Sequence, residues 1–182
     1  MPGWFNLPNS FTLLRVVLTP LIIKYIVEGR HMLALELFAL AAFTDYLDGA
    51  TARRLGVTSQ TGAYFDPVAD KLLLSGVFLA LAAARIVPWW LVAIIFGRDL
   101  LILGGVAIVL LFTSVRGFPP SVWGKASTFV QILTAVTWMG RNAFEIRVLD
   151  ALATLMLLPC VGFTVWSGLD YVRRGIQISR AH

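Results

Sequence analysis

Four aspartates lie within 26 residues of a chain that is otherwise strongly apolar. Asp45 and Asp48 are three positions apart, and Asp66 and Asp70 are four positions apart. On an α-helix both spacings place the side chains on one face, about one turn from each other. Apolar stretches flank the aspartates on both sides, so two helices joined by a short loop would gather the four carboxylates at or inside a membrane boundary. Ionisable residues are costly there, which indicates a functional site.

This acidic cluster needs compensation, because four like charges cannot share a small, partly dehydrated volume without a cation or bound protons. Hard divalent ions such as Mg²⁺, Mn²⁺ and Ca²⁺ prefer oxygen ligands and fit these residue types. An EF-hand is excluded, since the aspartates lack the alternating ligand spacing of that loop. A purely structural network with Arg53, Arg54 and Lys71 is the competing interpretation. Gly49 and Ala52 leave room for a ligand beside the backbone, which favours a metal and ligand site.

A longer pattern surrounds the cluster: Asp45-x2-Asp48-Gly49-x2-Ala52-Arg53-x8-Gly62-x3-Asp66-x3-Asp70. This pattern resembles the full signature of the CDP-alcohol phosphotransferases, which are membrane enzymes of phospholipid synthesis. The resemblance extends to Asn6-Leu-Pro-Asn9, to Asp66-Pro-Val-Ala-Asp70-Lys71 and to a basic C-terminal end. It therefore covers nearly the whole chain.

The resemblance implies a reaction in which an alcohol replaces CMP on a CDP-linked donor, here CDP-diacylglycerol. It implies that Asp45, Asp48, Asp66 and Asp70 hold two Mg²⁺ or Mn²⁺ ions, and that Asp70 is the catalytic base on the acceptor hydroxyl. It further implies a CDP-lipid-binding site made of Gly49, Ala52, Arg53, Thr58 and Gly62. A homodimer is also expected from the resemblance.

The acceptor alcohol is predicted less directly. Glycerol 3-phosphate is the first expectation, which would make the chain a phosphatidylglycerophosphate synthase. However, synthases of that product typically show Arg-Glu followed by Gly-Leu-Arg in the fourth span. This chain has Arg98-Asp99 and then Gly104-Gly105-Val106, so the second arginine is absent. Binding of a phosphate monoester then requires Arg116 or Lys125.

A second acceptor fits the same region. The pair Arg98-Asp99, together with Gly124-Lys125-x-Ser127-Thr128-x-x-Gln131, is similar to the cardiolipin synthases of this family, whose acceptor is phosphatidylglycerol. The candidate acceptor-binding residues are therefore Arg98, Arg116 and Lys125. Arg98-Asp99 also has a purely structural interpretation, as a buried pair that fixes helix register.

Composition predicts an all-α, polytopic membrane protein of one domain over 1–182. The 182 residues are 58% hydrophobic and 14% charged. Six apolar stretches, each near the ~20 residues that a helix needs to cross a bilayer, predict six transmembrane helices in one bundle. Arg15 lies near the start of the first stretch, where it can extend to the interface. Gly104 and Gly105 would permit close helix approach in the fourth. The six stretches are 11–27, 32–52, 64–84, 88–112, 124–140 and 148–170.

An even number of spans places both termini on one side. Seven basic residues fall on that side and four on the other, so the positive-inside rule puts the termini and the aspartates in the cytoplasm. The seven are Arg53, Arg54, Arg116, Lys125, Arg173, Arg174 and Arg180, and the four are Arg30, Arg85, Arg141 and Arg147. We therefore expect a multi-pass protein of the cell (inner/plasma) membrane. The net charge of +5 gathers near span ends, which fits contact with membrane lipids and not with nucleic acid.

Two other classes share some of these features. A membrane prenyltransferase also uses Asp-rich helices and Mg²⁺ to hold a prenyl diphosphate, but it usually has more spans than 182 residues supply. A small ion transporter would use carboxylates within the membrane without a nucleotide. Release of CMP from a CDP-lipid separates these alternatives from a phosphatidyltransferase.

Overall fold

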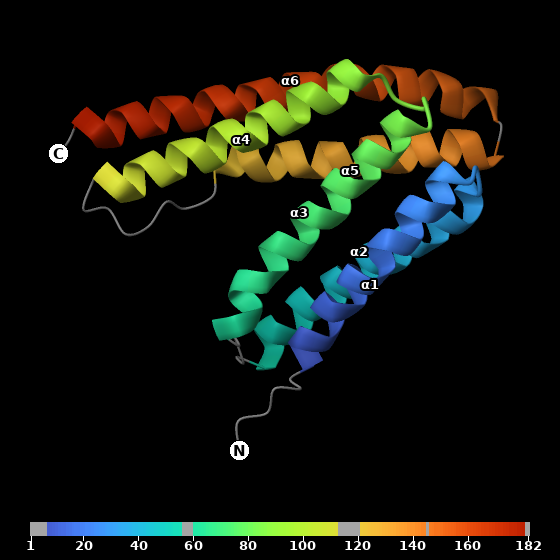
Figure 1. Cartoon of the computed structure of the whole chain (residues 1–182), viewed down its shortest axis with the longest axis horizontal. Helices are drawn as coiled ribbons and strands as arrows, with labels where there is room; N and C mark the ends of the chain where they lie inside the picture. The colour runs from blue at the N-terminus through green and yellow to red at the C-terminus, as the bar shows by residue number, and fades with distance from the viewer. Residues whose placement is uncertain (1–6, 56–59, 113–120, 145, 181–182) are drawn as a thin grey trace. The chain divides into compact units, whose positions relative to one another are not determined.

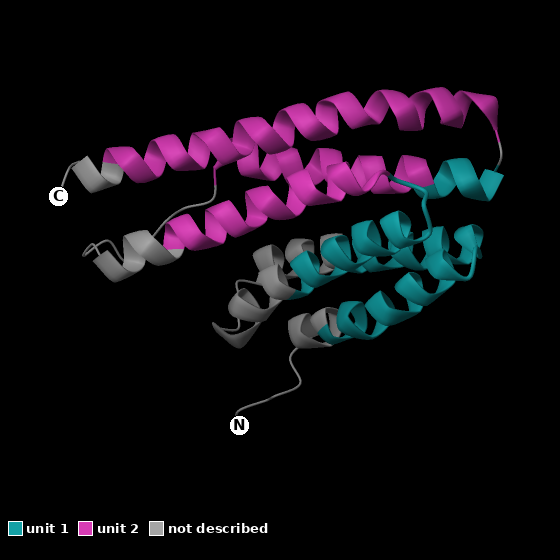
Figure 2. Ribbon diagram, turned by 45° about the horizontal axis from the view of Figure 1, so that its top comes forward, with its two compact units in different colours: residues 1–87, 139–145 teal, residues 88–138, 146–182 magenta. Residues whose placement is uncertain are grey.

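The computed structural model describes the backbone of residues 7–55, 60–112, 121–144 and 146–180. Within these ranges, the side chains of 7–12, 45–55, 60–68, 107–112 and 178–180 lie outside the described part. Every described element is helical, which confirms the predicted all-α class. The helices form two compact units: unit 1 comprises 1–87 and 139–145, and unit 2 comprises 88–138 and 146–182 (Figure 2).

Six helices occupy the described residues (Figure 1). They are α1 (Leu7–Val27), α2 (His31–Leu55), α3 (Gln60–Ala83), α4 (Trp89–Phe112), α5 (Val122–Phe144) and α6 (Arg147–Arg180). Each predicted stretch overlaps one helix. The largest difference is at the end of α6, which continues ten residues beyond the predicted boundary at 170. The helix persists there because polar residues end an apolar span without breaking a helix.

In unit 1, α1 packs against both α2 and α3. The contact surface repeats every four residues along α1, where Leu18, Ile22 and Ile26 are buried. This spacing keeps one helix face against its neighbours. Gly76 of α3 lets α1 approach closely, since a Cβ atom there would lie 2.8 Å from Cδ1 of Ile23. The packing of α1 thus holds α2 and α3 in one unit.

The ends of α1 and α3 have the same capping geometry. At the end of α1, the Arg30 N–H donates to Tyr25 O at 2.8 Å, and the N–H of Gly29, whose φ is 73°, donates to Ile26 O at 3.1 Å. This is a Schellman motif, in which glycine is the preferred residue at the left-handed position. At the end of α3 the corresponding left-handed residue is Arg85, with φ 58°.

In unit 2, α4 packs against α6. Side-chain hydrogen bonds join α5 to α6, and the ring of Trp123 meets that of Trp166 edge to face at a centroid distance of 5.9 Å. The buried residues of this unit include several hydroxyl and amide side chains, which sets it apart from the apolar contact along α1. They are Ser121, Ser127, Gln131, Thr134, Thr164 and Ser167.

Two of the six helices are long and apolar enough to cross a membrane within the described residues, over Trp89–Val106 and Arg147–Gln177. Both carry large apolar side chains on their outside: Leu103 is 65% exposed and Leu158 is 75% exposed. An exposed apolar surface of this kind favours contact with lipid. Whether the chain forms a single domain stays a prediction.

Candidate active site

The backbone places the four aspartates on two consecutive helices of unit 1. Asp45 and Asp48 lie in α2, and Asp66 and Asp70 lie in α3. Residues 56–59 join these two helices, as the short predicted loop requires. Among the four, only the Asp70 side chain belongs to the described part.

Asp70 forms an ion pair with Arg15 of α1. The Arg15 side chain is 1% exposed, whereas the Asp70 side chain is 48% exposed, so the pair runs from the interior of the unit to its surface. The expectation that Arg15 extends to the interface is therefore wrong. Because α1 packs against α3, the Asp70 carboxylate is within reach, and a paired guanidinium is less costly to bury than a free one.

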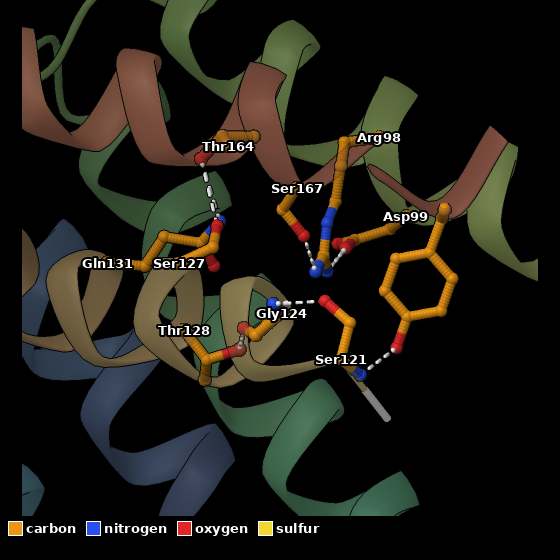
Figure 3. Close-up of polar contacts among 10 residues, drawn as sticks. Arg98, Asp99, Ser121, Gly124, Ser127, Thr128, Gln131, Thr164 and Ser167 are labelled. Atoms are coloured by element: carbon orange, nitrogen blue, oxygen red, sulfur yellow. Dashed lines mark hydrogen bonds and ion pairs between the residues drawn. The ribbon is translucent and has the colours of Figure 1, made fainter. Parts of the chain in front are cut away.

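Unit 2 contains a second buried arginine, Arg98 of α4 (Figure 3). Its Nη1 donates to Oδ1 of Asp99 at 3.0 Å, and its Nη2 donates to Oγ of Ser167 on α6 at 2.6 Å. The ring of Tyr171 lies 5.9 Å from the guanidinium carbon. The Arg98 side chain is 12% exposed. These contacts hold the guanidinium between α4 and α6.

The start of α5 is tied to the same place. The Ser121 N–H donates to the hydroxyl of Tyr171 at 3.1 Å, and the Gly124 N–H donates to Oγ of Ser121 at 3.1 Å (Figure 3). The second contact satisfies a free backbone donor of the first turn, as a helix cap does. Arg98 therefore lies beside the N-terminus of α5, where a helix favours negative charge.

A second polar group lies further along α5. Gln131 Nε2 donates to Oγ1 of Thr164 at 3.1 Å, and the Ser127 and Thr164 hydroxyl oxygens are 3.3 Å apart. All three side chains are buried. They satisfy one another's hydrogen-bonding groups, which is what a buried polar cluster requires.

Close packing in unit 2 occurs at different glycines from those predicted. A Cβ atom at Gly124 would lie 3.3 Å from Nη2 of Arg98, and one at Gly168 would lie 3.5 Å from Cγ of the same residue. At Gly104 and Gly105, no atom of the described residues lies within 4 Å of such a Cβ. Among the described residues, the close helix approach expected at those two glycines is therefore not seen.

The remaining predicted residues are only partly described. Gly49, Ala52 and Arg53 lie on α2 and Gly62 lies on α3, as helix positions without described side chains. Thr58 and Arg116 lie outside the described residues. Lys125 is exposed in the first turn of α5, one residue after Gly124. Arg98 of α4 and Lys125 of α5 thus both lie at the N-terminal end of α5 in unit 2.

Sequence reasoning missed the contribution of α6. Thr164, Ser167 and Tyr171 follow one another at spacings of three and four residues around the end of the apolar stretch 148–170. That spacing puts polar groups on one helix face and could have indicated a polar contact with a neighbouring helix.

The donor set fits hard divalent ions. Four aspartates supply only oxygen ligands, and no histidine or cysteine accompanies them in the stretch 45–70. The described Asp70 carboxylate is half-exposed and so accessible to an ion from outside the unit. Among the side chains that the structure describes, no group of three or more potential ligands occurs, and the acidic stretch remains a candidate on its sequence pattern.

An all-helical fold with exposed apolar helices, together with a stretch of four aspartates, is the combination expected of a membrane-associated, metal-dependent enzyme. The chain belongs to the CDP-alcohol phosphatidyltransferase family, whose model matches residues 5–166. It is therefore an enzyme, a phosphatidyltransferase of phospholipid synthesis, and the resemblance found in the sequence is confirmed. The family is membrane-bound and generally metal-dependent.

Several curated relatives share nearly the whole chain. A CDP-diacylglycerol–glycerol-3-phosphate 3-phosphatidyltransferase of Pseudomonas fluorescens is 38% identical, over 92% of this chain and 89% of its own length. A probable phosphatidylglycerophosphate synthase of Mycobacterium tuberculosis is 34% identical, over 94% of this chain and 82% of its own. A probable cardiolipin synthase (CMP-forming) of Drosophila melanogaster is also 34% identical, over 91% of this chain and 50% of its own.

Proposed function

We propose that this chain transfers the phosphatidyl group of CDP-diacylglycerol to glycerol 3-phosphate and releases CMP. The observation that carries this proposal is the similarity, over nine-tenths of the chain, to relatives named for that donor and acceptor. In the reaction the acceptor hydroxyl forms a bond to the phosphorus that bears diacylglycerol. The bond from that phosphorus to the CMP oxygen breaks, and the hydroxyl proton leaves.

The donor site in this proposal is the acidic stretch of unit 1. Asp45, Asp48, Asp66 and Asp70 would hold two Mg²⁺ or Mn²⁺ ions, which when bound neutralise the diphosphate charge. Asp70 takes the proton from the acceptor hydroxyl, and Arg15 orients its carboxylate. The CDP-lipid lies against Gly49 and Ala52, where small residues allow close approach to the helix backbone. Arg53 pairs with the diphosphate, and Thr58 and Gly62 line the nucleotide pocket.

The acceptor site in this proposal uses basic residues of unit 2. A phosphate monoester needs at least two cations besides the metals. Two guanidinium nitrogens of Arg98 are already bonded to Asp99 and Ser167, so this arginine serves as a fixed wall of the site. Lys125, exposed in the first turn of α5, and Arg116 would bind the phosphate directly.

Cardiolipin synthesis with phosphatidylglycerol as acceptor is the second candidate. It is favoured by the similarity to the Drosophila cardiolipin synthase. It is also favoured by the motif that includes Gly124, Ser127 and Gln131, which unit 2 buries beside α6. The family match favours both phosphatidyltransferases over the prenyltransferase alternative.

The test is an acceptor comparison with purified protein in detergent. CDP-diacylglycerol is supplied with either glycerol 3-phosphate or phosphatidylglycerol, and the lipid product is identified by mass spectrometry while CMP release is measured. We expect phosphatidylglycerophosphate from the first mixture, activity that is lost in EDTA, and recovery on addition of Mg²⁺ or Mn²⁺. Cardiolipin from the second mixture alone would reverse the choice of acceptor, and full activity in EDTA would contradict the metal site.

We further propose that all six helices span the cell membrane in a homodimer, with the acidic stretch facing the cytoplasm. Support comes from the excess of basic residues on the side of the termini. Cys160 is the only cysteine, so single-cysteine variants are easily made in a Cys160→Ala background. An impermeant maleimide should label Arg30→Cys in intact cells, and Thr58→Cys only after permeabilisation. The opposite labelling would reverse the orientation.

A further inference from the structure

Unit 1 has a cavity at the end opposite its aspartates. The cavity has a volume of about 380 Å³ and lies where α1 and α3 end and α2 begins. His31 and Asp48 are separated by 17 residues of α2, which is ~25 Å along a helix axis. The cavity is therefore separate from the candidate active site of the same unit.

Three nitrogen-bearing side chains and one amide line this cavity: His31, Arg85, Arg141 and Asn142. No carboxylate is among the lining residues that the structure describes. Nδ1 of His31 is buried and has no hydrogen-bond partner in the described part of the chain. A buried polar atom without a partner is costly unless a ligand satisfies it. The lining is thus suited to an anion with several acceptor oxygens.

Arg85, one of the residues that line the cavity, has a backbone conformation that is unfavourable for a residue with a side chain. Its φ of 58° is in the left-handed region, which glycine adopts freely and arginine does not. Its N–H donates to Ala82 O at 3.0 Å, and the N–H of Ile86 donates to Leu81 O at 2.8 Å. The same motif at the end of α1 has Gly29 at this position, and Gly29 lines the same cavity. Strained non-glycine residues concentrate at functional sites.

The Arg85 guanidinium is available for a ligand. It forms neither an ion pair nor a hydrogen bond with any residue that the structure describes, and the residue is exposed. Burial lowers the pKa of His31, which favours the neutral imidazole, and the neutral ring can carry its proton on Nδ1 as a donor. The cavity is therefore lined by two guanidinium groups, one imidazole and one amide, of which the Arg85 guanidinium is the exposed cation on which the test rests.

We propose that this cavity binds a phosphate group, carried by an anionic lipid headgroup or by a free phosphate. Arginine forks match phosphate oxygens with paired hydrogen bonds, and the buried His31 nitrogen supplies a further donor. With the aspartates in the cytoplasm, this end of unit 1 lies at the outer surface of the membrane. The site is separate from the reaction described above and does not depend on its acceptor.

The test compares variants that keep the fold. Arg85→Gly removes the guanidinium and relieves the left-handed strain, so the melting temperature should stay unchanged or rise. Arg85→Asn serves as a second variant, because asparagine tolerates this conformation. Arg147→Gln is the charge-matched control, since Arg147 is exposed at the start of α6 and does not line the cavity.

Two binding measurements distinguish the sources of the phosphate. Inorganic phosphate is titrated into protein in neutral detergent, with chloride at equal ionic strength as reference. In a second arm, phosphatidic acid is added to phosphatidylcholine nanodiscs and the retained lipid is counted by native mass spectrometry. Phosphatidic acid is neither substrate nor product of the proposed reactions, and turnover is not measured, so this test is independent of the proposed function.

We expect binding in at least one arm that both Arg85 variants weaken about tenfold or more and that Arg147→Gln leaves unchanged. Equal binding by the wild type and both Arg85 variants in both arms would overturn the proposal, and so would equal loss in Arg147→Gln. If the arginines serve only to complement helix C-termini, Arg85→Gly would lower the melting temperature without changing phosphate binding, which would also overturn it.

Discussion

Each compact unit buries an arginine against an aspartate, but the two pairs are built differently. In unit 1, Arg15 and Asp70 come from helices α1 and α3, and the carboxylate is half-exposed. In unit 2, Arg98 and Asp99 are neighbours in one helix, their side chains are 12% and 7% exposed, and Ser167 of α6 completes the contact. The first pair leaves its acid accessible for chemistry, whereas the second lies within one helix and joins α4 to α6 through Ser167.

The largest effect should come from Asp70→Asn. Turnover with CDP-diacylglycerol should fall about 10²-fold or more, because the amide cannot accept the hydroxyl proton. Binding of the CDP-lipid should remain measurable. Asp150→Asn, which removes an exposed acid in the first turn of α6, is the charge-matched control. CMP release measures turnover, and near wild-type release from Asp70→Asn would assign the base elsewhere.

Arg15→Met should have the next largest effect. The Asp70 carboxylate loses its charged partner on α1, and kcat should fall about tenfold as its orientation relaxes. A positioning role predicts that KM for CDP-diacylglycerol changes less than kcat, and that Arg15→Lys recovers part of the rate. If KM and kcat respond equally, or if folded protein is lost, then Arg15 has a structural role only. The Arg–Asp pairs of the two units would then both be structural.

Ser167→Ala tests whether the hydrogen bond from Arg98 to Ser167 stabilises unit 2. The variant removes the 2.6 Å hydrogen bond to Nη2 of Arg98, and a hydrogen bond to a charged group contributes about 1.5–3 kcal/mol. The free energy of unfolding in detergent should fall by that order. Thr154→Ala is the matched control on α6, because its exposed hydroxyl bonds only to the Asp150 carbonyl of its own helix. Equal losses of unfolding free energy in both variants would show that the contact between Ser167 and Arg98 makes no stabilising contribution of its own.

The smallest effect should come from Gln131→Leu. The Ser127 and Thr164 hydroxyls can still bond to each other across 3.3 Å, so only the amide contacts to Thr164 at 3.1 Å and to Ser127 at 3.4 Å are lost. Hydrogen bonds between helices in membranes average ~0.6 kcal/mol, and a loss of about that size is expected in unfolding measurements. Thr137→Ala, whose hydroxyl bonds within α5 alone, should change less. A loss above about 2 kcal/mol would indicate that the cluster is strongly cooperative.

The helices were predictable because each apolar run is long enough to cross a membrane, and Pro20 and Pro159 lie inside helices without ending them. Each of the six predicted stretches overlaps one helix, and the connections after Val27 and Ala83 fall close to the predicted gaps. The end of α6 was not predictable from hydropathy, since a polar helix continues an apolar one without a change in backbone geometry. Hydropathy locates spans, whereas helix ends depend on local capping.

The placement of the four aspartates on two consecutive helices was predictable, because their spacings of three and four residues match one helix face. The partner of Asp70 was not, since Arg15 is 55 residues away and its contact depends on how α1 packs on α3. The surroundings of Arg98 were predictable only for Asp99, its neighbour in sequence. Ser167 and Tyr171 lie about 70 residues further on, and their contact with Arg98 follows from the packing of α4 on α6.

The length of α6 has a mechanical consequence. Its 34 residues extend ~50 Å, whereas the hydrocarbon core of a bilayer is ~30 Å thick. The surplus lies at the C-terminal end, where Asp170, Arg173 and Arg174 follow the apolar stretch and Nε of Arg174 pairs with Oδ2 of Asp170 at 3.0 Å. Such a helix continues out of the lipid as a stiff spacer of several turns. A fluorescent protein fused after residue 182 would be held clear of the headgroups, at a height above the bilayer set by this helix.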